Sequence, residues 1–155
     1  MKADGGEDFA EAALDGIQAC IDLMEWRPVS QKFVFHITDA PPHGQEFNAT
    51  NHLDNYPKGC PCGLKLEDVA KGMNDRRIKY RLLKIGNRLE NMTSIFKKHI
   101  NTYADCELEH ATKVLDIICG SLLSDVTELQ TKVNKSMTDD KMLSTLVIEH
   151  TGSKP

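Results

Sequence analysis

The clearest functional side chains in this sequence, Thr38 and Asp39, directly follow an apolar run. That run, residues 33–37, reads Phe-Val-Phe-His-Ile, and a nearly continuous apolar run is typical of a parallel strand covered on both faces. Residues 41–44, Pro-Pro-His-Gly, end the regular structure. Functional groups in open α/β sheets gather just beyond the carboxyl ends of such strands. We therefore expect Asp39 to be a functional residue.

A second set of side chains has the chemistry of a zinc site. It consists of His43, His52, Cys60 and Cys62. Imidazole and thiolate are common Zn²⁺ ligands, but Cys-x-Cys is not the common Cys-x2-Cys spacing of such sites. The alternative interpretation is that these residues pack within a proline-rich loop, and the sequence leaves both interpretations open.

Two further carboxylates, Glu7 and Asp8, precede the first predicted helix. Asp8 followed by Glu11 is a variant of the capping box, so the first prediction is that Asp8 caps this helix. Loop-to-helix junctions lie at the same sheet edge as strand ends, so both carboxylates could instead face a metal ion. His36, within the apolar run, is predicted to be a hydrogen-bonded core histidine rather than a ligand or a base.

The elements that must position these residues follow from hydrophobic periodicity. The pattern predicts a helix over 9–26, a strand over 33–37, a helix over 66–76, a strand over 78–85 and a helix capped by Asn87. Residues 40–65 lack periodicity and are predicted to be an irregular insertion. Basic residues alternate along 78–85, which indicates a sheet edge or an exposed face. The predicted class is α/β.

The C-terminal third has a different pattern. After a loop at 101–105, apolar residues recur at helical spacing to about residue 134 and approach a heptad repeat. Cys106 and His110 are predicted to lie on this helix. Residues 135–155 are mostly polar, and the apolar stretch 142–148 is predicted to be a loosely attached strand or tail.

Composition limits the class of protein. The chain has 155 residues, enough for one domain with a core, and a net charge of −4, which argues against a nucleic-acid partner. No apolar run approaches the roughly 20 residues of a membrane helix, and the N-terminus lacks a signal-peptide core. Five unevenly spaced cysteines argue against a disulfide framework. We expect a reducing, cytoplasmic setting.

Three motifs carry a resemblance to a known family. They are Ala3-x-Gly5-Gly6-x-Asp8-x-x-Glu11, the block Phe35-His36-Ile37-Thr38-Asp39-Ala40-Pro41-Pro42-His43-Gly44, and Tyr56-Pro57-x-Gly59-x-Pro61-Cys62-Gly63-Leu64. With Trp26 and Ile78-x-Tyr80, this order resembles the later half of the von Willebrand factor A-like (VWFA) domain. It is most similar to the version in alpha-type protein kinase proteins. The resemblance covers residues 3–101.

The resemblance implies a partial doubly wound, Rossmann-like sheet with a metal-ion-dependent adhesion site at its carboxyl edge. In that family the ion is usually Mg²⁺, and Asp39 matches the aspartate that follows the fourth strand. Thr38 is expected to bind the ion together with Asp39, directly or through water, and Glu7 or Asp8 would replace the usual threonine of the second loop. Hard oxygen donors suit this ion. The Asp-x-Ser-x-Ser loop of the family is absent, so the site is predicted to be incomplete and its first loop to precede Met1.

The expected organisation is a VWFA-like portion over 1–101, a helical extension over 102–134 and a tail over 135–155. The expected function is a non-catalytic protein-interaction module. The alternative is a fragment of a regulatory domain of an alpha-type serine/threonine protein kinase, because no phosphate loop or catalytic segment is identifiable here. Self-association is expected through the uncovered edge of the strand at 33–37 or through the long helix.

Overall fold

The computed structural model describes residues 8–48 and 53–151, with side chains described up to residue 138. Glu7 and His52 lie outside the described residues. The chain divides into two compact units, Met1–Ala111 (unit 1) and Thr112–Pro155 (unit 2). Each unit is described by itself.

Unit 1 is built on a parallel sheet. Its strands are β1 (Lys32–Thr38), β2 (Ile78–Lys84) and β3 (Ala104–Glu107), in the order β1-β2-β3. Lys32 pairs with Ile78 and Thr38 with Lys84, so β1 and β2 run in register over their whole length. Helices between successive strands make the crossovers that parallel pairing requires. The predicted α/β class with a Rossmann-like parallel sheet is therefore confirmed.

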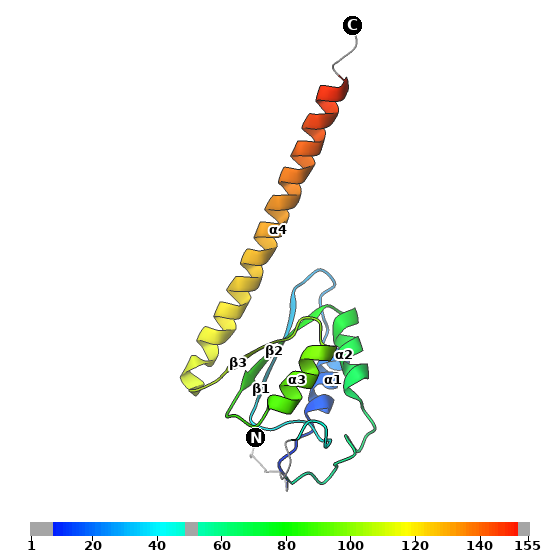
Figure 1. Cartoon of the computed structure of the whole chain (residues 1–155), viewed down its shortest axis with the longest axis vertical. Helices are drawn as coiled ribbons and strands as arrows, with labels where there is room; N and C mark the ends of the chain where they lie inside the picture. Colours follow the sequence, from blue (N-terminus) through cyan, green and yellow to red (C-terminus); the bar gives the residue numbers. More distant parts are fainter. Residues whose placement is uncertain (1–7, 49–52, 152–155) are drawn as a thin grey trace. The chain divides into compact units, whose positions relative to one another are not determined.

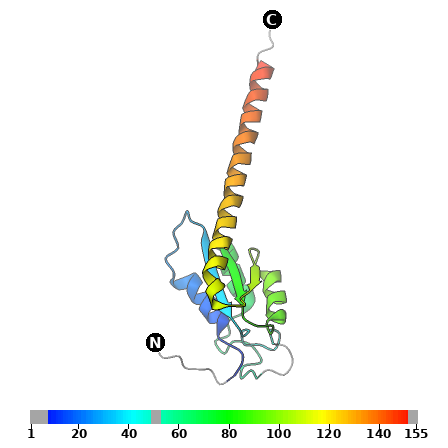
Figure 2. The same cartoon turned by 90° about the vertical axis from the view of Figure 1, so that its left-hand side faces the viewer.

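Three helices, α1 (Ala13–Leu23), α2 (Leu66–Asp75) and α3 (Glu90–His99), cover one face of this sheet (Figure 1; Figure 2). The core lies between the helices and the sheet. Its largest fully buried apolar and aromatic side chains are Tyr80, Phe96, Met73, Ile78, Leu82, Leu89, Met92 and Ile100. Three of these come from alternate positions of β2, as expected for one face of a strand.

The prediction that the strand at 78–85 lies at a sheet edge is wrong, because β2 is the central strand. The alternative prediction, that the basic residues of this strand lie on an exposed face, agrees better with the structure. Lys79 and Arg81 are half-buried and lie 5.7 and 5.9 Å from the centroid of the Phe33 ring. Cations at these distances interact with the face of an aromatic ring, which accounts for basic residues in a central strand.

The first helix begins four residues later than predicted. Residues 9–11 instead pair with the loop that follows β1, as Phe9 N donates to Leu53 O and Glu11 N to Pro41 O, both at 2.9 Å. The residue before α1 is Ala12, which makes no side-chain cap. Asp8 is therefore not the predicted helix cap. Likewise, α3 begins at Glu90, so Asn87 does not cap it.

The segment after α3 also differs from the prediction. Residues 104–107 form β3, so Cys106 and His110 do not share a helix. Strand β3 is polar and short, and tertiary contacts hold it: Lys84 Nζ lies 2.8 Å from Asp105 and 2.7 Å from Glu107. Both ion pairs are partly buried. Hydrogen bonds to the carboxylates of Asp105 and Glu107 raise the pKa of Lys84.

Unit 2 is a single long helix, α4 (Val114–Thr151), which follows a 3₁₀ turn at Ala111–Lys113. The helix continues through the residues 142–148 that were predicted to be a strand or tail. Met142, Leu143, Leu146 and Val147 also fit helical spacing, so this short apolar run was ambiguous. None of the described helices is long and apolar enough to cross a membrane.

Candidate functional site

Thr38 and Asp39 lie at the carboxyl end of β1, as predicted. The Thr38 hydroxyl donates to Ala40 O at 2.7 Å and accepts from Ala40 N at 3.1 Å. These contacts close a local turn and use the hydroxyl hydrogen within the chain. The Asp39 side chain is exposed. The strand end thus presents one carboxylate to solvent.

Of the other predicted magnesium ligands, Asp8 belongs to a different group of side chains, and Glu7 lies outside the described residues. Asp8 groups with His43 and Asp54, and its Oδ2 accepts a hydrogen bond from Asn55 N at 2.7 Å. Within residues 8–48 and 53–138, no group of three or more metal-binding side chains includes Asp39. Mg²⁺ usually needs several oxygen ligands in octahedral geometry. That Asp39 is a ligand of Mg²⁺ therefore stays a prediction.

The group around Asp54 organises the irregular loop after β1. Asp54 Oδ2 accepts from Gly44 N at 2.9 Å and from Asn48 Nδ2 at 3.1 Å. Asp54 Oδ1 accepts from Tyr56 N at 2.8 Å and contacts His43 Nδ1 at 2.9 Å. A carboxylate has about four lone-pair sites, so these contacts use all of them. Asp54 is therefore a structural centre of the loop.

The side chain of Asp54 is mostly buried, with 6% of it exposed, whereas the residue as a whole is half-buried. Burial alone would raise the pKa of this carboxyl. The hydrogen bonds from Gly44 N, His43 and Tyr56 N oppose that effect, and the net pKa lies below its usual value. Sequence reasoning missed Asp54, although Asp-Asn-Tyr-Pro is typical of a turn in which an aspartate accepts from the residue two positions on.

We predict that Asp54→Asn lowers the free energy of unfolding of unit 1 by about 1–3 kcal/mol at pH 7. The amide nitrogen would replace an acceptor that now faces two N–H donors. Because the folded pKa is depressed, the contribution of Asp54 is present above the unfolded pKa of about 4 and is lost as the pH falls through the folded value. Urea unfolding followed by fluorescence of Trp26, the single tryptophan, measures the loss.

Asp39→Asn, at an exposed carboxylate, is the matched control and should change stability by less than about 0.5 kcal/mol. Equal stability of Asp54→Asn and wild type would refute the role given to Asp54.

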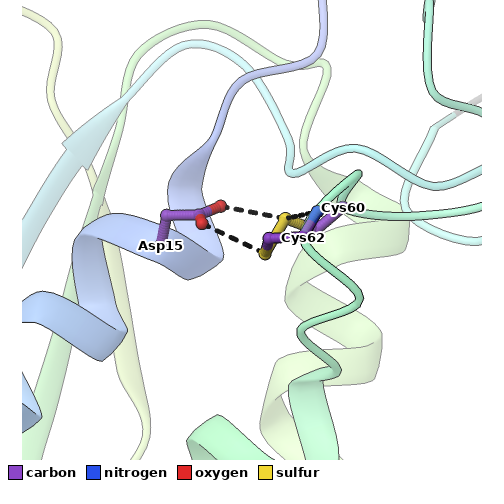
Figure 3. Close-up of side chains that lie close together, drawn as sticks. All are labelled: Asp15, Cys60 and Cys62. Atoms are coloured by element: carbon purple, nitrogen blue, oxygen red, sulfur yellow. Dashed lines mark hydrogen bonds between the residues drawn. A yellow bond between two sulfur atoms is a disulfide. The ribbon is translucent and has the colours of Figure 1, made fainter.

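The predicted zinc residues that the structure describes, His43, Cys60 and Cys62, fall into two separate groups. Cys60 and Cys62 form a disulfide and lie beside Asp15, in the first turn of α1 (Figure 3). The Asp15 oxygens Oδ2 and Oδ1 lie 3.1 Å from Cys60 Sγ and 3.2 Å from Cys62 Sγ. His43 belongs to the Asp54 group instead. His43 and Cys60 share only the lining of a cavity of about 340 Å³. Sequence reasoning did not find Asp15, which lies 45 residues from Cys60.

His36 is a core histidine, as predicted. Its Nδ1 lies 2.6 Å from the hydroxyl of Tyr80. Burial lowers the pKa of His36 to about 4, so the ring is neutral at pH 7. Burial, followed by the nearby Tyr103, raises the pKa of Tyr80, so its hydroxyl keeps its proton. The Tyr80 O–H therefore donates to Nδ1, and the ring proton of His36 lies on Nε2.

Comparison with known proteins gives one partial similarity. The chain is 40% identical over 80 residues to the alpha-protein kinase vwkA of Dictyostelium discoideum. The matched segment is 52% of this chain and 12% of the relative. No protein-family model matches the chain. The similarity supports a relation to an alpha-protein kinase, and it extends over a small part of that kinase.

Proposed function

We propose that unit 1 is a non-catalytic protein-interaction module of VWFA type with an incomplete metal-ion-dependent adhesion site. The observation that carries the proposal is the exposed Asp39 carboxylate at the carboxyl end of a strand in a parallel sheet. The 40% identity to an alpha-protein kinase named vwkA agrees with it. Mg²⁺ would need ligands in addition to Asp39, because Thr38 and Asp8 are engaged elsewhere in the chain.

Magnesium titration by calorimetry tests this proposal. We predict no saturable heat for the wild-type chain below about 1 mM Mg²⁺, in the weak range of metal sites with few charged ligands. The same trace is expected for Asp39→Ala. Saturable binding by the wild type that is lost in Asp39→Ala would show that the site is complete in this chain. Asp116→Ala, at an exposed carboxylate of unit 2, controls for nonspecific binding.

The alternative function is a fragment of a regulatory domain of an alpha-type serine/threonine protein kinase. This alternative is favoured because the relative is an alpha-protein kinase. The matched segment covers 12% of that kinase. The genomic sequence on both sides of this chain discriminates between the two functions. An alpha-kinase domain encoded in the same reading frame supports the alternative, and its absence from that reading frame argues against it.

Self-association and a cytoplasmic location complete the proposal. Among the described strands, β1 pairs on one side only, which supports pairing through its free edge. Exposed apolar side chains of α4, including Leu123, Val126 and Val133, support an interaction through the helix. Three cysteines, Cys20, Cys106 and Cys119, are free thiols, as in a reducing compartment, whereas the Cys60–Cys62 disulfide is an exception to that expectation.

A further inference from the structure

We propose that Asp15, Cys60 and Cys62 form a binding site for Zn²⁺ that is open when the cysteines are reduced and closed by their disulfide. This inference goes beyond the proposed function, because it involves neither Asp39 nor a protein partner. It also differs from the zinc set expected from the sequence, since Asp15 replaces His43 and His52.

The three donors converge from two elements. Asp15 projects from the first turn of α1, and both cysteines lie on the loop that precedes α2 (Figure 3). One ligand atom from each residue lies within 4.8 Å of the other two. With Zn–S near 2.3 Å and Zn–O near 2.0–2.2 Å, ligand atoms around a tetrahedral ion are roughly 3–4 Å apart. Small side-chain rotations therefore suffice to place one ion among the three.

Two tight turns hold the sulfurs toward α1. Gly59 N donates to Tyr56 O at 3.0 Å, and Gly63 N donates to Cys60 O at 2.9 Å. Both glycines have positive φ, 106° and 80°, which side chains rarely adopt. Cys62 N also donates to Cys60 Sγ at 3.4 Å. A backbone N–H directed at sulfur stabilises the thiolate form that binds metals.

Charge explains why the group would select a cation. Each cysteine sulfur lies beside one oxygen of Asp15, at 3.1 and 3.2 Å, and reduction of the disulfide would give each sulfur a proton to donate to that oxygen. Loss of both thiol protons would leave two thiolates and a carboxylate in one small volume. A divalent cation compensates this charge, and its binding releases the two protons. Thiolate ligands favour Zn²⁺ over Mg²⁺ or Ca²⁺.

Access to the site is open on one side. Cys62 is exposed, and Cys60 lines the cavity of about 340 Å³ beside it. A fourth position on the ion is thus available to water. His43 lines the same cavity, but its Nδ1 is held by Asp54 at 2.9 Å.

Oxidation closes the site. In exchange with a small-molecule disulfide such as glutathione disulfide, the two thiols lose two protons and two electrons and form the Cys60–Cys62 bond. The small disulfide gains them and leaves as two thiols. A disulfide sulfur is not a thiolate and no longer binds zinc. The other three cysteines take no part, because they are free.

Cobalt titration of the full chain tests the site, with Co²⁺ as an optical probe that Zn²⁺ displaces. For the chain reduced with a phosphine, we predict a thiolate-to-cobalt charge-transfer band that saturates at a single equivalent. Cys60→Ser and Cys62→Ser should each abolish the band. Asp15→Asn should weaken binding at least about tenfold, since even losing a group that only orients a ligand costs that much.

Controls separate this site from other sources of binding. Cys119→Ser, at an exposed thiol in unit 2, should bind as wild type does. His43→Gln should also bind as wild type, whereas weaker binding would favour the zinc set expected from the sequence. Treatment of wild type with glutathione disulfide should remove the band, and reduction should restore it. No band in the reduced wild type, or unchanged affinity in Asp15→Asn, would overturn the assignment.

Discussion

Phe96→Ala is expected to lower the free energy of unfolding of unit 1 by about 3–5 kcal/mol, the range for a buried phenylalanine. Phe96 is fully buried on α3. Its ring centroid lies 5.8 Å from that of Tyr80 on β2 and 5.9 Å from that of Phe47 in the loop after β1. The substitution therefore leaves a cavity where helix, sheet and loop meet.

Urea unfolding followed by Trp26 fluorescence measures this effect. Trp26 is half-buried in unit 1 and donates from Nε1 to Cys20 O at 2.9 Å, so it reports on this unit. Leu23→Ala is the matched control, because 78% of Leu23 is exposed, and it should cost less than about 1 kcal/mol. Similar losses for the two variants would mean that Phe96 does not join the three elements. A lower free energy of unfolding in Phe96→Ala but not in Leu23→Ala would also indicate that the contact of Phe96 with Phe47 anchors the loop after β1 to the core.

Acidification from about pH 6.5 to pH 4 is expected to destabilise unit 1 by about 3 kcal/mol through His36. The pKa of this ring falls from 6.5 to about 4 on folding because it is buried. Between these values the unfolded chain binds the proton and the folded chain does not. The stability contributed by neutral His36 is thus complete above about pH 6.5 and is lost as the pH approaches 4.

His36→Gln tests this dependence, because the amide oxygen can still accept from the Tyr80 hydroxyl. Free energies of unfolding at pH 7 and pH 4.5 should differ by about 2–3 kcal/mol less in the variant than in wild type. His110→Gln, at an exposed histidine, should keep the wild-type difference. The pKa of Asp54 lies below its usual value. Asp54 therefore loses its contribution to stability at a lower pH than His36 does. An unchanged pH dependence in His36→Gln would show that His36 is not buried as a neutral ring.

The features that were predictable are those encoded within a few neighbouring residues. The apolar run ending at Thr38 and Asp39 predicts β1 and its carboxyl end, and the alternation from Ile78 predicts β2. Helix α2 follows its periodicity to within one residue. The apolar neighbours of His36 predict a core histidine. Side-chain period and turn residues are local properties, so the chain carries them wherever it folds.

The tertiary structure alone decided which polar groups meet. Asp54 collects donors from Gly44, Asn48 and Tyr56, and Asp15 meets cysteines that are 45 or more residues away. The tertiary structure also decided that the polar residues 104–107 form β3, because these residues pair with β2 and form ion pairs with Lys84. These contacts depend on the path of the whole chain. Thr38 and Asp39 show both contributions: the sequence determined their position at a strand end, and only the fold decided that Thr38 closes a turn while Asp39 faces solvent.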